Sequence, residues 1–192
     1  MSDQDGIAKR GRSLEDEYFR KKDRELIEKL RRAADAEQAR KELGRKAGLD
    51  DPQLVQELQA LGFTPDTVSL LPLVPIVQMA WAEGGITKPE RELIVRLAKN
   101  RGIEPGSAAD AQLTKWLNNR PSEDVFARAT RLIRAMLDAG SEQTADLNAD
   151  DLVKYCEEIA SASGGILGIG RISAEERALL TSLAADLNAR RT

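Results

Sequence analysis

The side chains of this sequence that could do chemistry are carboxylates and amines. The 192 residues include no histidine and a single cysteine, Cys156. Histidine is the commonest general base, the usual partner of serine and cysteine nucleophiles, and a frequent zinc ligand. The sequence also lacks a glycine-rich phosphate loop and a nucleophile elbow. It therefore predicts no catalytic residue and no zinc site, and it favours a binding protein over an enzyme.

Cys156 lies in an apolar stretch with the spacing of a buried helix face, which predicts a packed thiol. With one cysteine, no intramolecular disulfide can form, and the composition fits a reducing cytoplasm. The sequence shows no apolar signal-peptide core and no apolar run long enough to span a bilayer. We therefore expect a soluble, cytoplasmic protein.

Charge is distributed unevenly along the chain. The net charge is −3. Residues 9–46 contain 14 Lys or Arg against 9 Asp or Glu, a local charge of +5, which leaves −8 for the rest. The overall balance gives no reason to expect nucleic acid as a partner. The basic segment is either a solvated helix face or a docking arm for an acidic partner. Attachment to an anionic membrane is a third reading, which the thin apolar face of the segment does not favour.

The elements that position these residues are expected to be helices. Residues 1–12 are polar, and we expect a disordered lead. Ser13, with Asp16 three residues later, predicts the start of a long charged helix over residues 13–47, because no proline interrupts it. The remaining residues, 48–192, form the predicted globular domain.

Residues 48–192 carry repeated signals for helix starts and stops. Prolines stand where a first helical turn is expected, and glycines stand just past the ends. Aromatic and β-branched residues are scarce, and no stretch alternates as a strand does. The fold class is therefore all-α, a compact multi-helix bundle. Helix starts are expected at residues 50–52, at residues 64–65, and at the capping residues Thr87, Ser107, Ser122, Asn148 and Ser173.

Two parts of this domain resemble each other. Residues 86–98 align without gaps to residues 172–184, and both begin with an isoleucine and a capping box closed by Glu90 or Glu176. Each follows a Gly-Gly pair. This predicts an internal helix-loop-helix duplication. Chance similarity is the alternative, because capping boxes are common.

The stretch Ala-Trp-Ala-Glu-Gly-Gly-Ile-Thr-Lys-Pro-Glu at residues 80–90 resembles the signature of TerB-like domains, shared with the N-terminal domain of the DjlA co-chaperone. The resemblance covers residues 66–190. It implies a helical bundle in two related halves. It also implies an association with tellurite resistance or another stress response.

In that family the acidic loop residues are candidate ligands for a divalent metal, which points here to Glu83, Glu90 and Glu176. Position 83 is Glu where the family usually has Asp, and the second loop, residues 163–165, carries no acid. Calcium and magnesium need several converging oxygen ligands. We therefore read Glu90 and Glu176 as helix caps and assign no metal ligand and no cofactor. Weak binding of a divalent cation is left open.

The basic arm contains a second resemblance. Glu15 to Arg20, followed by Arg24, Glu25 and Leu26, is similar to the inhibitory segment of the mitochondrial ATPase inhibitor protein. Adjacent aromatics on a charged helix suit insertion into a groove, and Tyr, Phe and Arg are efficient interface anchors. An external protein partner, packing against the chain's own domain and self-association remain alternatives. The predicted partner-binding residues are Glu17, Tyr18, Phe19, Arg20, Arg24 and Leu26.

Two functional hypotheses follow. The leading one is a non-enzymatic, protein-binding or regulatory module of the TerB-like type in a cytoplasmic stress response. The alternative is a regulator or inhibitor of a large ATPase, or of a similar assembly, that inserts its N-terminal helix. The first expects residues 48–192 to suffice, and the second expects Tyr18, Phe19 and Arg20 to be indispensable.

Overall fold

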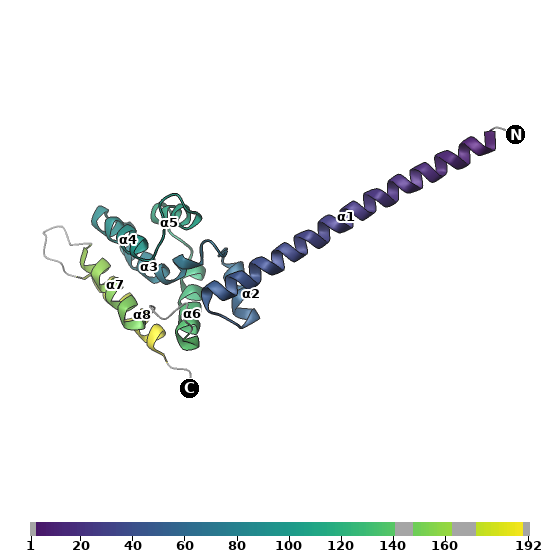
Figure 1. Ribbon diagram of the computed structural model, residues 1–192. Helices are drawn as coiled ribbons and strands as arrows, with labels where there is room; N and C mark the ends of the chain where they lie inside the picture. The colour runs from purple at the N-terminus through teal and green to yellow at the C-terminus, as the bar shows by residue number, and fades with distance from the viewer. Residues whose placement is uncertain (1–2, 141–147, 163–171, 190–192) are drawn as a thin grey trace. The chain divides into compact units, whose positions relative to one another are not determined.

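A computed structural model describes the backbone of residues 3–140, 148–162 and 172–189, and the side chains of residues 18–140, 148–162 and 172–189. Within these residues, the regular secondary structure consists of eight α-helices and one 3-10 helix, so the predicted all-α class is confirmed (Figure 1). The chain divides into two units, residues 1–39 and residues 40–192. We call them the arm and the body and describe each by itself.

The arm is made of helix α1, which runs from Asp3 to Ala47 and whose last two turns belong to the body. The helix begins ten residues before the start expected at Ser13, so most of the expected disordered lead is helical. No proline lies in this stretch to interrupt the helix. The capping signal at Ser13 falls inside a helix that continues through it.

The body begins earlier than residue 48, the predicted boundary. Leu43 and Ala47 at the end of α1 are buried. Gly44 lies between them at a close approach, where an added Cβ would stand 2.9 Å from the Leu49 carbonyl oxygen and 3.0 Å from a Val55 methyl group. The end of α1 therefore packs into the body. The sequence did not indicate this packing, because the apolar residues at the end of α1 are few and are separated by charged residues.

Five of the body's helices start where the sequence predicts a helix start, whereas the start expected at residues 64–65 falls in a turn before η1, which begins at Val68. Asp51, Thr87, Ser107, Ser122 and Ser173 each accept a hydrogen bond from the backbone of the following first turn. These bonds satisfy amide groups that a helix start leaves unpaired. The elements are α2 (Pro52–Ala60), η1 (Val68–Leu73), α3 (Val74–Ala80), α4 (Lys88–Asn100), α5 (Ala108–Asn118), α6 (Glu123–Ala139), α7 (Ala149–Ala162) and α8 (Ala174–Asn188).

The short helix α3 is the centre of the body. It contacts η1, α4, α6, α7 and α8 (Figure 1). Its residues are apolar around most of the helix, and only Gln78 is polar. A helix that is apolar all round must be buried. Pro72 lies inside η1, one residue before its end at Leu73, and Pro75 lies in the first turn of α3. The 3-10 helix therefore gives way to an α-helix between the two prolines, where the sequence predicts a break or a restart.

Both tryptophans of the chain lie in the body, and a hydrogen bond joins them. The Trp81 indole N–H donates a hydrogen bond to the Trp116 carbonyl oxygen at 2.9 Å. The ring of Phe63 packs edge-on against Trp116, with centroids 6.0 Å apart. These contacts tie the end of α3 to α5.

Candidate functional site

The start of α4 is a complete capping box. The Thr87 backbone N–H and hydroxyl each donate to Glu90 Oε2 at 2.6 Å, and the Glu90 backbone N–H points back to the Thr87 hydroxyl at 3.5 Å. Glu90 is 2% exposed. The carboxylate is therefore buried and held by its own helix start.

The start of α8 repeats this arrangement. The Ser173 backbone N–H donates to Glu176 Oε2 at 2.7 Å, and the Glu176 backbone N–H donates to the Ser173 hydroxyl at 3.1 Å. Glu176 is 1% exposed. Both predicted caps are confirmed, and the two aligned segments start their helices in the same way. The second predicted loop, residues 163–165, lies outside the described residues.

The three predicted acidic residues lie near one another. The pKa of Glu90 is raised, first because burial disfavours its charged form and then because of the charges of Glu176 and Glu83. The hydrogen bonds from Thr87 oppose this rise. The folding of two distant segments thus brings two buried carboxylates into electrostatic contact, with exposed Glu83 beside them. No group of three or more Cys, Asp or Glu placed to hold a metal occurs in the described part of the chain.

Cys156 on α7 is buried, as predicted. Burial is the main cause that raises the pKa of its thiol to about 12, and the charge of Glu157 adds to it. The reactive form of cysteine is the thiolate. This sulfur is therefore a packed apolar group at neutral pH.

The exposed face of α1 is the second candidate site. The exposed large apolar side chains of the described residues all lie on this helix, with Tyr18 57%, Phe19 61% and Leu26 55% exposed. The Tyr18 and Phe19 rings meet edge to face at 5.9 Å between centroids, and the Lys22 ammonium lies 5.7 Å from the Tyr18 centroid. We call the set Tyr18, Phe19, Leu26, Ile27 and Leu30 the α1 face, which at 3.6 residues per turn spreads over about half of the helix circumference.

The α1 face extends the predicted partner-binding set by one turn. Ile27 and Leu30 are also exposed. Leu30 follows Leu26 by four residues and Ile27 by three, so these side chains are neighbours on the helix surface. That spacing was the signal by which the sequence could have included them. The side chain of Glu17, the remaining acidic member of the predicted set, lies outside the described residues.

Charged side chains accompany the α1 face. Arg24 Nε donates to the Arg20 carbonyl oxygen at 3.3 Å, and Lys22 pairs with Glu25 at 3.6 Å. All four side chains are exposed. Exposed local contacts of this kind add little stability.

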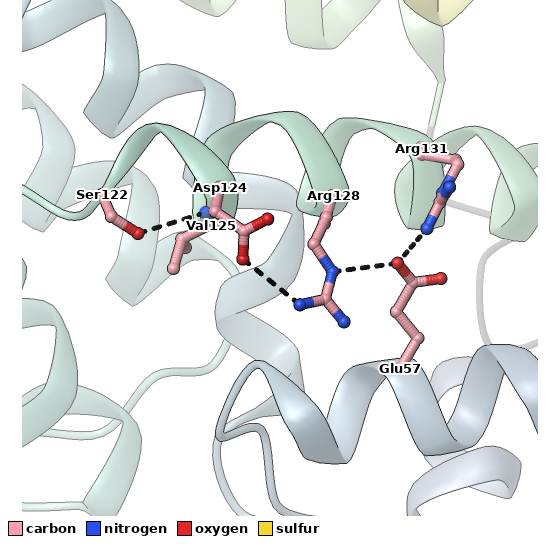
Figure 2. A network of polar contacts seen from close by, with 6 residues as sticks. All are labelled: Glu57, Ser122, Asp124, Val125, Arg128 and Arg131. Atoms are coloured by element: carbon pink, nitrogen blue, oxygen red, sulfur yellow. Dashed lines mark hydrogen bonds and ion pairs between the residues drawn. The ribbon is translucent and has the colours of Figure 1, made fainter.

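A polar cluster in the body joins α2 to α6. Figure 2 shows Glu57 accepting hydrogen bonds from Arg128, at 3.0 Å, and from Arg131, while Arg128 also pairs with Asp124 at 3.2 Å. Glu57 is 14% exposed. The cluster balances two cations against two acids and stabilises the packing of α2. Its partners lie 71 and 74 residues apart, so no local pattern predicts it.

The chain shows no match to a protein family, to a curated protein or to a solved structure. The TerB-like and ATPase-inhibitor resemblances therefore remain predictions. Among the described residues, no helix combines the length and the apolar character needed to cross a membrane.

Proposed function

We propose that this chain is a non-enzymatic protein-binding module in which the α1 face is the recognition element, so that, unlike in the leading hypothesis from the sequence, residues 48–192 do not suffice. The observation that carries the proposal is the gathering of exposed large apolar side chains on one helix, while the body buries its own. Exposed apolar area of this kind gains free energy when a partner covers it, about 25 cal/mol per Å². A helix that presents such a face fits an apolar groove.

The charges beside the α1 face indicate which charges the rim of the partner's groove carries. From Tyr18 to Arg24 the helix carries four cations and one acid. Opposite charge at the rim of an interface speeds association and fixes register. We therefore propose a protein partner whose apolar groove is bordered by Asp and Glu side chains.

The body supplies a folded anchor. If its resemblance to TerB-like domains reflects a shared role, the module acts in a cytoplasmic stress response. Two observations support that reading. The signature segment at residues 80–90 leads into a capping box, and α8 starts with the same arrangement. The buried, unpaired thiol of Cys156 suits a reducing compartment.

A large ATPase or similar assembly is the second candidate partner. It is favoured by the exposure of Tyr18 and Phe19, the two adjacent aromatics that the segment shares with the mitochondrial inhibitor. Insertion would bury both rings and leave Arg20 to pair at the edge. On this reading the chain regulates the assembly by occupying a groove that must change shape during turnover.

The proposal is tested by affinity capture from native lysate with the full chain. One variant carries Tyr18→Ala with Phe19→Ala, and the matched control carries Lys29→Ala with Gln38→Ala, two exposed polar positions of the same helix. Alanine favours helix at all four positions. We expect the aromatic variant to lose partners that the control retains. Equal recovery of the same partners by both variants would show that the α1 face is not the recognition element.

A further inference from the structure

We propose that the body binds a small zwitterion, a molecule with one carboxylate and one ammonium group, in a cavity between α3, α6 and α8. The cavity has a volume of about 420 Å³, within the usual range for small-molecule sites. Its residues belong to the body alone, so this site goes beyond the recognition by α1 and does not depend on it.

Arg134 supplies the cation of the site. It lines the cavity from α6 and is half-buried. Within the described parts of the chain it has no hydrogen bond and no ion pair. The other arginine of the lining, Arg131, is already bonded to Glu57. A guanidinium that is partly desolvated and unpaired attracts a carboxylate, which it can bind through two parallel hydrogen bonds.

Two acceptors in the same lining have no partner among the described residues. The Gln78 side-chain oxygen is buried and has no hydrogen-bond partner among the described residues. Asp186, an exposed residue that lines the cavity from α8, makes no hydrogen bond or ion pair to the described residues. The second acid of the lining, Glu123, is paired with Arg120. An ammonium group has three N–H donors and no acceptor, which suits an amide oxygen and a carboxylate together.

The remaining lining gives the ligand an apolar part. Leu183 is 3% exposed and Leu179 is half-buried, and both face the cavity from α8. One unpaired cation and one unpaired acid line a single cavity without bonding each other. A zwitterion can pair with both charges at once, whereas a simple anion or cation can pair with only one of them.

The test uses the full chain and four small probes. Leucine and 6-aminohexanoate are zwitterions with short and long separations of charge. N-acetyl-leucine and leucinamide each keep one charge. Binding is followed by isothermal titration and by chemical shifts of the Gln78 side-chain amide. We expect at least one zwitterion to bind and both single-charge analogues of leucine to bind about tenfold more weakly or not at all.

Two conservative variants locate the site. Asp186→Asn removes a charge with little change in shape, and Arg134→Gln removes a charge while leaving a shorter polar side chain. Arg96→Gln, at an exposed arginine of α4, is the matched control for the second change. We expect each of the first two to weaken the zwitterion about tenfold and the control to leave it unchanged. Circular dichroism confirms folding, and the analogue series with the unaltered chain does not depend on the variants.

Three results would overturn the proposal. Absence of binding by both zwitterions would mean that water alone fills the cavity. Equal binding of leucine and its single-charge analogues would show that the site does not pair with both charges of the ligand. Zwitterion binding that survives both Arg134→Gln and Asp186→Asn would place it elsewhere on the chain.

Discussion

Phe126 in the body and Phe19 in the arm show how differently the two units use the same side chain. Phe126 is 0% exposed and packed in the core, with Arg120 5.4 Å from its ring centroid. Phe19 is 61% exposed. The body therefore obtains its stability from its own core. The arm is a single helix whose large apolar side chains are exposed.

The largest effect that tests this comparison comes from Phe126→Ala. Emptying a buried phenylalanine site costs about 3–5 kcal/mol in the free energy of unfolding. Phe19→Ala should change the same quantity by less than about 0.5 kcal/mol. Urea denaturation followed by tryptophan fluorescence measures both, because Trp81 and Trp116 lie in the body. A large loss from Phe19→Ala would mean that the α1 face is covered within the chain itself.

Gly44→Ala tests whether the last turns of α1 belong to the body. Alanine improves helix propensity by about 1 kcal/mol. Its Cβ would nevertheless press on the Leu49 carbonyl oxygen and on Val55, and overpacking typically costs about 1–3 kcal/mol. We expect a net loss in the free energy of unfolding. Gly85→Ala is the control, because nothing lies within 4 Å of its added Cβ. Stabilisation by Gly44→Ala would place the start of the body after this helix.

Glu57→Gln in the body and Glu28→Gln in the arm compare how much an ion pair contributes to stability in each unit. In the body the change removes the charge that Arg128 and Arg131 share across two helices. In the arm, Glu28→Gln removes one exposed i,i+4 pair with Arg32. We expect Glu57→Gln to lower the thermal midpoint by a few degrees, on the order of 1 kcal/mol or less. Glu28→Gln should leave it unchanged within error. Equal midpoints for both variants would mean that the contact between α2 and α6 does not depend on this cluster.

Glu90→Gln has the smallest effect, and its sign depends on pH. The folded pKa of Glu90 is raised, so the folded state holds this proton more tightly than the unfolded state does. Its contribution to stability is full below the unfolded pKa, near 4.5, and is lost as pH rises through the folded pKa. Glutamine keeps a hydrogen-bond acceptor and has no charge. The stability of the variant relative to the parent chain should therefore increase from pH 4 to pH 7, as measured by urea midpoints. A constant difference across that range would contradict the raised pKa.

Local signals in the sequence predicted much of the fold. Capping residues, prolines and glycines act within a few positions of themselves, so the starts of α2, α4, α5, α6 and α8 could be assigned from their own segments. The capping roles of Glu90 and Glu176 were accessible for the same reason. The apolar residues of the arm were visible as a stripe on a charged helix.

Contacts between distant segments were not accessible from the sequence. The Glu57 cluster, the electrostatic contact between Glu90 and Glu176, and the cavity lined by Gln78, Arg134 and Asp186 each depend on how helices pack. The start of the body was also missed, because two buried residues among charged ones do not form a periodic pattern. Helix packing depends on complementary surfaces. The sequence indicates which residues of a helix are apolar, but it does not indicate which other helix covers them.

The buried sulfur of Cys156 makes the chain suitable for site-specific labelling. Since the only native thiol is packed and its pKa is raised to about 12, maleimide and similar reagents have almost no thiolate to attack at neutral pH. A cysteine introduced at an exposed position of α1, such as Gln38, would take the label alone. A fluorophore or spin label placed there could report the motion of the arm without first removing any native residue.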